Sequence, residues 1–204
     1  MIRVVVIDRH PAMRAGIERI FDAVAGIHVV AGASAHDRNE ISHALYRTAP
    51  DVVLVEDAPG RADGVALARE LKSYGPDPKV LLLADRPDAV QVATAILADA
   101  DGIVDSGAQP RELVEAVQTV AARGRVFPAL GRRDLADIAQ RLPAEDHAIL
   151  AMRLAATPRR EISDTLSIDA RALRQRLTAM IGRLRAGAAA ALSVPPGPPG
   201  WQAR

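Results

Sequence analysis

VVLVEDAPG, residues 52–60, runs four apolar residues directly into two adjacent carboxylates and then into a loop with Pro59 and Gly60. Val and Leu readily form a buried strand. Glu56 and Asp57 are costly to bury unless each finds a partner. The stretch therefore predicts a core strand whose far end carries a polar site.

Similar apolar runs alternate with helical patterns through the first 124 residues. The predicted strands are 3–7, 27–33, 51–55, 79–84 and 102–104, and the predicted helices are 11–24, 39–47, 65–74, 87–98 and 110–123. Strands that are apolar on both faces and separated by helices indicate a parallel sheet covered on both sides. We expect an α/β domain over residues 1–124, a doubly wound five-stranded parallel sheet of the flavodoxin-like kind.

Composition excludes several classes of site. The 204 residues are 49% hydrophobic and include no cysteine, so disulfides, thiolate zinc sites and cysteine nucleophiles are ruled out. No apolar run approaches the roughly 18 residues that a membrane span needs, and the N-terminus lacks a secretory pattern. No nucleophile–base pair, glycine-rich phosphate loop or metal-ligand cluster is apparent. We expect a cytoplasmic protein that is not an enzyme, with no cofactor, no metal and no membrane partner.

The second part of the chain differs in charge and pattern. Residues 1–124 carry 13 Lys and Arg against 18 Asp and Glu, whereas residues 125–204 carry 13 against 7. This asymmetry favours two domains with different partners. The predicted order after 124 is a linker (125–141), a small all-α domain (142–185) and a disordered Pro- and Ala-rich tail (186–204). Two alternatives stay open: a short helix over 134–140 inside the linker, and an extension of the last helix over 186–192.

The all-α domain has the spacing of a helix-turn-helix. Helices are predicted over 143–155, 157–166 and 169–185, the last of them basic. Side chains of types that contact DNA bases or phosphates are Arg159, Arg160, Arg171, Arg174, Gln175, Arg176 and Thr178. Residues 141–185 hold nine Arg and five acids, a charge that suits double-stranded DNA. The alternative is a basic helical domain that binds no DNA.

Motifs in the first domain resemble the receiver domain of bacterial response regulators of the NarL/FixJ type. The matching segments are VVVIDRHPAMRAGI (4–17), PDVVLV (50–55), ADG (62–64), ADADGIV (98–104) and QPREL (109–113). The resemblance implies an acidic pair after the first strand, a phosphate-accepting Asp after the third, a hydroxyl after the fourth and a Lys after the fifth. The acids in that family bind Mg²⁺.

Only the first of these site positions keeps its chemistry. Asp8 matches the first acid, but Arg9 stands at the second, Glu56 at the phosphate acceptor, Ala84 at the hydroxyl and Ser106 at the Lys. A guanidinium would repel Mg²⁺, which prefers carboxylate and water oxygens. The sequence therefore predicts a degenerate phosphorylation pocket.

Arg9 is predicted to pair with Glu56 in a fork geometry and to lock the domain in one state. The alternative is that Arg9 points to solvent and Glu56 is a solvated acid. Asp57 could be a displaced phosphoacceptor, but the pocket lacks the electrostatic help that phosphoryl transfer needs.

The second domain resembles the LuxR-type DNA-binding domain through LPAEDHAIL (142–150), TPRREISDTLSI (157–168) and DARALRQRLTAMIGRL (169–184). The resemblance places Arg174, Gln175 and Thr178 toward the major groove and Arg171 and Arg176 near the DNA backbone. It also implies a fourth, dimerising helix, for which no separate counterpart follows Arg185.

The leading hypothesis is a DNA-binding transcription regulator of the two-component type whose receiver is not activated by phosphorylation of an aspartate. We expect a homodimer formed through the receiver-like domain, with control by dimerisation, a small-molecule effector or a protein partner. Two surfaces are candidates for the dimer contact. One consists of helix 110–123 with the strand and helix before it, and the other of helix 11–24 with helix 110–123. The alternative function is an interaction or antagonist module that has lost DNA binding.

Overall fold

The computed structural model describes residues 1–73 and 78–192, with side chains to residue 186. Five strands, β1 (Ile2–Ile7), β2 (Ile27–Ala33), β3 (Val52–Glu56), β4 (Lys79–Ala84) and β5 (Gly102–Asp105), form one sheet. Every pairing is parallel, and the order is β2-β1-β3-β4-β5. The predicted fold class is confirmed, and each predicted strand is present within one residue of its expected bounds.

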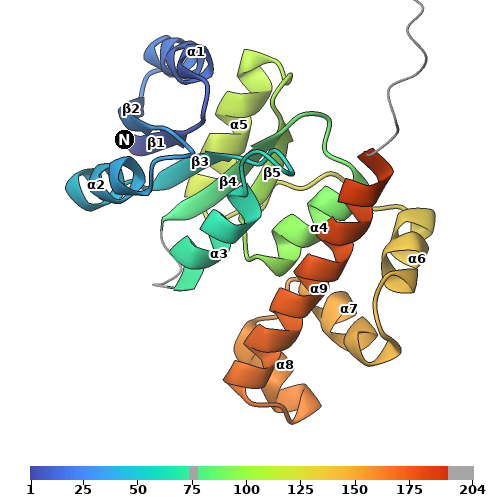
Figure 1. Cartoon of the computed structure of the whole chain (residues 1–204). Helices are drawn as coiled ribbons and strands as arrows, with labels where there is room; N and C mark the ends of the chain where they lie inside the picture. Colours follow the sequence, from blue (N-terminus) through green and yellow to red (C-terminus); the bar gives the residue numbers. More distant parts are fainter. Residues whose placement is uncertain (74–77, 193–204) are drawn as a thin grey trace, which may run out of the picture.

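Helices cover both faces of the sheet (Figure 1). α1 (Pro11–Asp22) and α5 (Pro110–Ala121) pack on one face, and α2 (Arg38–Thr48), α3 (Gly64–Ser73) and α4 (Ala89–Leu97) pack on the other. Alternate residues of β3 serve the two faces: Val53 and Val55 face α3 and α4, whereas Leu54 faces α1 and α5. A strand buried on both sides explains the unbroken run of Val and Leu.

Residues 125–192 form a second unit, which meets the sheet through a parallel bridge between Val126 and Gly102 and is helical from Arg132 onward. It contains α6 (Arg132–Gln140), the short 3-10 helix η1 (Ala144–Asp146), α7 (His147–Leu154), α8 (Arg159–Leu166) and α9 (Ala170–Leu192). The turn between α8 and α9 starts at Ser167, whose φ of 52° ends α8, and Asp169 caps α9 by accepting from the N–H of Ala172 at 2.7 Å. These elements match the predicted helix-turn-helix.

At two boundaries the structure follows the alternative that the sequence left open. The segment predicted as the linker 125–141 contains α6, which includes the expected short helix 134–140 and whose Ile138 is buried. Residues 186–192, assigned to the tail, instead extend α9, because Ala and Leu are strong helix formers. The rest of the predicted tail, residues 193–204, lies outside the described residues.

The helical unit packs on the receiver-like sheet domain through α4. α9 and α7 contact α4 most extensively, and α6 contacts it as well. Met180, Ile181 and Leu184 of α9 are buried there and belong to the same apolar cluster as Val53 and Val55 of β3. One continuous core therefore joins the two units. Within the described residues, no helix is long and apolar enough to cross a membrane.

Candidate functional site

The predicted pocket lies at the carboxyl edge of the sheet, where β1, β3, β4 and β5 end. Asp8 and Arg9 follow β1, and Glu56 ends β3. The structure brings these three residues together. Ala84 and Ser106 lie farther along the same edge, joined by a hydrogen bond from the N–H of Ser106 to the carbonyl of Ala84 at 2.8 Å.

Arg9 and Glu56 form an ion pair, as the sequence predicts. Arg9 Nη1 lies 2.7 Å from Glu56 Oε1, and both side chains are largely buried. The expected fork of two parallel guanidinium bonds is not formed. Glu56 Oε2 instead accepts the backbone N–H of Arg9 at 2.9 Å, which leaves one carboxylate oxygen for the guanidinium. The alternative of a solvent-directed Arg9 is wrong.

Asp8 and His10 complete this cluster. Asp8 Oδ1 accepts the N–H of His10 at 2.7 Å and lies 3.2 Å from His10 Nδ1. Arg9 Nε donates to His10 Nε2 at 3.1 Å, so the proton of a neutral His10 ring is assigned to Nδ1. The cluster is thus held together by charge and hydrogen bonds, although Arg9 Nη1 meets Glu56 only as an ion pair and has no hydrogen-bond partner among the described residues.

The cluster does not fit the Mg²⁺ ion that the resemblance to receivers implies. Ligand atoms of Asp8, His10 and Glu56 lie within 4.8 Å of one another, close enough to hold a metal. However, both oxygens of Glu56 are engaged by Arg9, and Asp8 Oδ1 is engaged by His10. Mg²⁺ requires several free oxygens in an octahedron and no nearby cation. The guanidinium supplies the positive charge that a metal would otherwise bring.

Asp57 has a different partner, which sequence reasoning missed. Its side chain is fully buried, and Oδ1 lies 3.1 Å from Arg185 Nη1 of α9 and 3.3 Å from the N–H of Val65 of α3. Arg185 also lies 3.4 Å from Asp63. The other oxygen of Asp57, Oδ2, has no hydrogen-bond partner within the described residues. The two adjacent carboxylates of the β3 end are therefore held by two different arginines.

Burial raises the pKa of the Asp57 carboxyl above its usual range, and the positive charge and hydrogen bond of Arg185 oppose this rise in pKa. Arg185, a residue of the helical unit, is therefore the largest influence that favours the charged form of Asp57. A phosphodonor would have to displace Arg185 to reach it.

Gly64 allows α3 to start beside the two carboxylates. A Cβ atom at this position would lie 2.5 Å from the carbonyl oxygen of Glu56 and 3.0 Å from the Cβ of Asp57. Only glycine fits this approach. It brings the N–H of Val65 to Asp57, so the ADG motif has a structural role at the site.

The predicted DNA-contacting residues do not form one open surface. Arg159 pairs with Asp99 in the loop after α4. Thr178 accepts a hydrogen bond from Arg69 of α3. Arg176 binds Asp146 of η1 at 2.7 Å and the carbonyl of Glu145, so it stabilises the helical unit from within. The predicted position of Arg176 beside the DNA backbone stays a prediction, since its guanidinium is bound inside the helical unit here.

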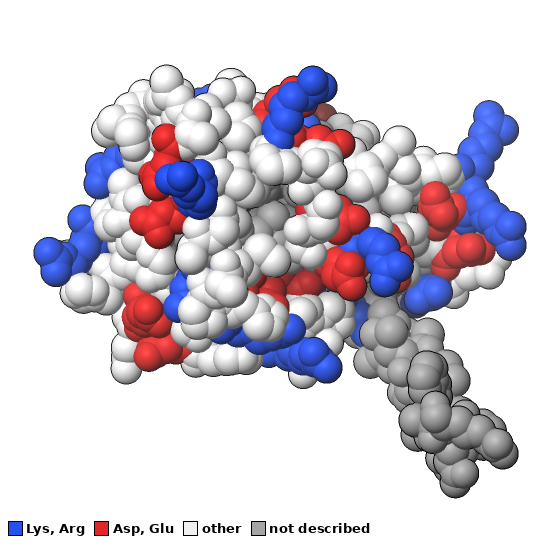
Figure 2. All heavy atoms as spheres, turned by 90° about the horizontal axis from the view of Figure 1, so that it is seen from above, with Lys and Arg blue, Asp and Glu red and all other residues white. Residues whose placement is uncertain are grey.

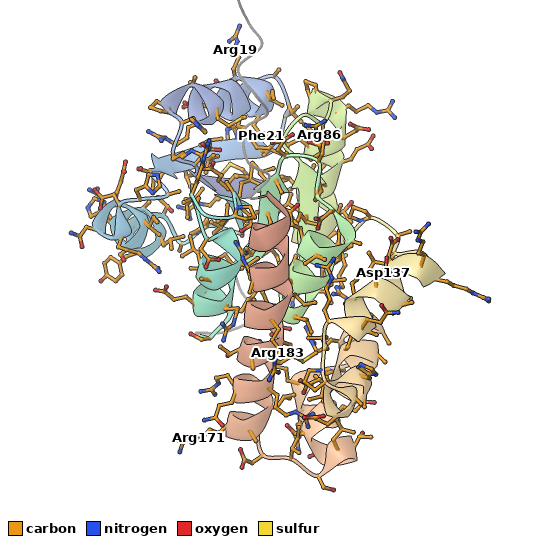
Figure 3. The ribbon with its side chains drawn as sticks, turned by 45° about the vertical axis from the view of Figure 1, so that its right-hand side comes forward. Arg19, Phe21, Arg86, Asp137, Arg171 and Arg183 are labelled. Carbon is orange, nitrogen blue, oxygen red and sulfur yellow. The ribbon has the colours of Figure 1, made fainter. Side chains whose placement is uncertain are left out.

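Arg160, Arg171 and Gln175 remain exposed, as does Arg174, which lines a cavity against α3. Figure 3 shows Arg171 at the tip of α9, far from the sheet, and Arg183 midway along the helix. On the face drawn in Figure 2, Lys and Arg side chains of the described residues are interspersed with Asp and Glu. Among the predicted DNA-contacting residues, the exposed ones thus lie in α8 (Arg160) and in the first turns of α9.

Comparison with protein families matches residues 4–118 to the response regulator receiver domain. Among characterised proteins, the chain is 33% identical over 143 residues to the response regulator UvrY of Escherichia coli K12, covering 70% of this chain and 61% of that protein. It is 25% identical over 173 residues to the transcriptional regulatory protein MctR of Rhizobium johnstonii, covering 82% and 79%. The chain spans about 61% of the length of the UvrY relatives.

Solved structures show the same fold. A LuxR-family two-component response regulator from Aurantimonas sp. SI85-9A1 matches with 26% identity and a TM-score of 0.56, covering 69% of this chain and 96% of that one. The receiver domain of a response regulator NarL from Mycobacterium tuberculosis matches with 30% identity and a TM-score of 0.52, covering 59% and 96%. The RcsB regulator of Salmonella typhimurium, at 19% identity and a TM-score of 0.59 over 90% of this chain, shares the fold.

Proposed function

Since the chain belongs to the response regulator receiver family, we propose that it is a DNA-binding transcription regulator whose receiver is not switched by phosphorylation of an aspartate. The observation that carries the proposal is the occupation of both carboxylates at the end of β3 by arginines. Arg9 holds Glu56 from within the receiver, and Arg185 holds Asp57 from α9. In this arrangement each carboxylate is held by an arginine, the Asp57 side chain is fully buried, and the oxygens of Glu56 leave no place for Mg²⁺.

Physical chemistry supports this reading of the pocket. Phosphoryl transfer depends on cations that neutralise the transferring group and on a nucleophile open to attack. Here the cations are already bound to the carboxylates, and the Asp57 side chain is fully buried. Ala84, in the place of a hydroxyl, offers no donor to a phosphoryl group. Glu56 is also a weak mimic of phospho-aspartate, because a carboxylate has fewer oxygens and less charge than a phosphoryl group.

DNA binding is proposed from the helical unit. α8 and α9 have the helix-turn-helix order, and Arg160, Arg171, Arg174 and Gln175 are exposed on or next to α9. The contacts of Arg159 and Thr178 with the receiver would have to open before those side chains could reach DNA. We therefore propose that the chain binds DNA weakly in the described arrangement.

A homodimer is proposed through α1 and α5. The other surface considered, α5 with β5 and α4, includes a helix that α6, α7 and α9 already cover. α1 and α5 lie together on the opposite face of the sheet (Figure 1). A two-fold contact there would leave the helical unit accessible to DNA.

Two measurements test the proposal. Incubation with a small phosphodonor and Mg²⁺ should leave the intact mass unchanged; a gain of one phosphoryl group would refute the reading of the pocket. Selection from a random pool of duplex DNA across a salt series should enrich a specific sequence, with affinity falling steeply as salt rises.

A second function is favoured by the internal contacts of Arg159, Arg176 and Thr178. A chain in which these residues stay engaged would be an interaction module that pairs with other regulators. The selection experiment separates the two functions, because the interaction module would enrich no sequence even at low salt. Co-purification of a second regulator's receiver domain would then identify its partner.

A further inference from the structure

Two cavities lie along the seam between α3 and the helical unit, and α3 and α9 run side by side there (Figure 3). One cavity of about 320 Å³ is lined by Lys72, Lys79, Asp99, Asp101, Arg125 and Arg153. The other, of about 560 Å³, is lined by Arg69, Glu70, Lys72, Arg159 and Arg174 among others. Lys72 borders both, so the cavities adjoin. Their volumes are in the usual range for small-molecule sites.

The larger cavity has an excess of positive charge. Its charged lining consists of four basic residues and Glu70. Glu70 pairs with Arg38, Lys72 with Asp101 at 2.6 Å and Arg159 with Asp99, so the excess of positive charge comes from Arg69 and Arg174. Within the described part of the chain, neither Arg69 nor Arg174 has an ion-pair partner, and Arg69 donates only to the hydroxyl of Thr178. A groove with one sign of charge and protein walls concentrates ions of the opposite sign.

Arg153 and Arg159 crowd the same region from the helical unit. Both guanidinium groups share the single carboxylate of Asp99. Arg153 is 6% exposed and also donates to the carbonyls of Thr157 at 3.0 Å and Ile96 at 3.1 Å. The Nε atoms of both arginines are buried, and neither has a hydrogen-bond partner among the described residues. Buried donors without partners are rare in folded proteins, so two in neighbouring arginines show that the guanidinium groups outnumber the acceptors available there.

Burial and repulsion by neighbouring cations lower the pKa values of Arg153 and Arg69. Burial lowers the pKa of Arg153, the carboxylate of Asp99 opposes this, and the charges of Arg159 and Arg125 lower the pKa of Arg153 further. Burial and then the charge of Arg159 likewise lower the pKa of Arg69. A bound anion would relieve this repulsion.

We propose that the seam is a binding site for a small phosphorylated metabolite with two or more negative charges. The guanidinium groups of Arg69, Arg159 and Arg174 hold its phosphate in the larger cavity, with the paired donor geometry that arginine offers to phosphate oxygens. Arg153 closes the site from the smaller cavity. A DNA duplex is too wide for a cavity of this volume, so a small anion is the occupant that the geometry favours.

The binding itself goes beyond the proposed function, and only its consequence for DNA rests on that function. A phosphate held between Arg69 of the receiver and Arg159 and Arg174 of the helical unit ties the two units together. It also occupies two of the side chains that were predicted to contact DNA. The ligand would therefore stabilise the closed arrangement and weaken DNA binding.

Calorimetric titration of the full chain with pyrophosphate, at ionic strength held constant with sodium chloride, tests the site without DNA. We expect saturable binding of one pyrophosphate per chain and a melting temperature that rises with ligand concentration. Inorganic phosphate, with fewer charges, should bind at least tenfold more weakly.

Arg174→Gln is the decisive variant, because Arg174 is exposed and has no ion pair whose loss would unfold the chain. It should weaken pyrophosphate binding at least tenfold, and Arg69→Gln should do the same. Arg19→Gln is the matched control, since Arg19 is exposed on α1, far from the seam (Figure 3). Absence of saturable binding, or equal binding by all three variants, would overturn the proposal. Failure to bind any DNA would remove the proposed function but leave this result unchanged.

Discussion

Glu56 and Asp57 are neighbours in the sequence, yet they are held by different parts of the molecule. Glu56 is held by Arg9, which lies in the next loop of the same sheet edge, so its pair belongs to the receiver alone. Asp57 is held by Arg185, which comes from the last helix of the second unit. The Glu56 pair therefore stabilises the receiver alone, whereas the Asp57 pair forms only when the two units are docked.

The docking can be broken without touching either carboxylate. Leu184 of α9 is fully buried in the core shared with α4. Leu184→Ala should lower the free energy of unfolding by about 2–5 kcal/mol, the usual cost of truncating a buried leucine. Urea denaturation measures this loss. Leu135→Ala in α6 is the control, since Leu135 is only half-buried and should cost less; an equal cost for both would argue against tight docking.

The Asp57 pair can be broken directly by Arg185→Gln. This change leaves a buried carboxylate without its cation and should lower the free energy of unfolding at neutral pH by about 1–3 kcal/mol. The chain should also show faster hydrogen exchange in α9. Arg183→Gln two residues earlier is the control, because Asp146 keeps its bond to Arg176 when Arg183 is removed. Hydrogen exchange that stays the same in Arg185→Gln would contradict the docking role.

Breaking the ion pair of Glu56 should lower the free energy of unfolding by less than breaking the pair of Asp57. Arg9→Gln removes the guanidinium, but Glu56 keeps the backbone N–H of Arg9. We expect a loss of about 1 kcal/mol, confined to the receiver, because the backbone N–H still satisfies one oxygen of Glu56 and the glutamine amide can donate to the other. Arg9→Asp combined with Glu56→Asp restores the family's acids, and this variant should bind Mg²⁺ measurably in calorimetry where the original chain does not. Binding of Mg²⁺ by the original chain would contradict the role given to Arg9.

The smallest effect concerns the pKa of the Asp57 carboxyl group, which NMR measures from the resonance of its carboxyl carbon. Asp57 should titrate above 3.8, the ordinary pKa of an aspartate side chain, because burial penalises the charged form, with Asp63 adding to the rise and Arg185 opposing it. The native carboxyl then binds a proton more tightly than the unfolded one. Its contribution to stability is therefore full below pH 3.8 and is lost as the pH rises through the raised pKa.

Arg185→Gln should raise the Asp57 pKa further, since the arginine lowers it. Asp105 is the internal reference: hydrogen bonds from the backbone N–H groups of Gly107 and Arg86 lower its pKa, and Arg185 is not among the causes. A shift of both carboxyl groups in the variant would point to general unfolding, and no shift of either would deny the contact between Arg185 and Asp57.

Local pattern was enough to predict much of the fold. The apolar run of β3 and its four counterparts predicted the sheet, because strands buried on both faces must be apolar throughout. The Arg9–Glu56 pair was also predictable, because parallel strands β1 and β3 are neighbours and end at the same edge. Its hydrogen-bond geometry was not, because the backbone N–H of Arg9 competes for one oxygen.

The contact between Arg185 and Asp57 could not be predicted from the sequence, because it depends on how the two units dock. The pattern of α4, however, carries a signal for the docking itself. α4, with the sequence AVQVATAIL, is apolar all around, and a helix of that kind must be covered on both sides. Its buried residues include Val92 and Ala95. That pattern predicted a second layer over α4, and the helical unit is that layer.

α9 is one unbroken helix of 23 residues, roughly 34 Å long at 1.5 Å per residue. Its middle part, from Met180 to Leu184, is buried in the core shared with α4, and its N-terminal tip, with Arg171, extends beyond the sheet domain (Figure 3). A tilt of about 10° around Ile181 would move Arg171, about 15 Å away along the helix, by about 3 Å. A rearrangement beside Asp57 would therefore shift the residues that are proposed to contact DNA.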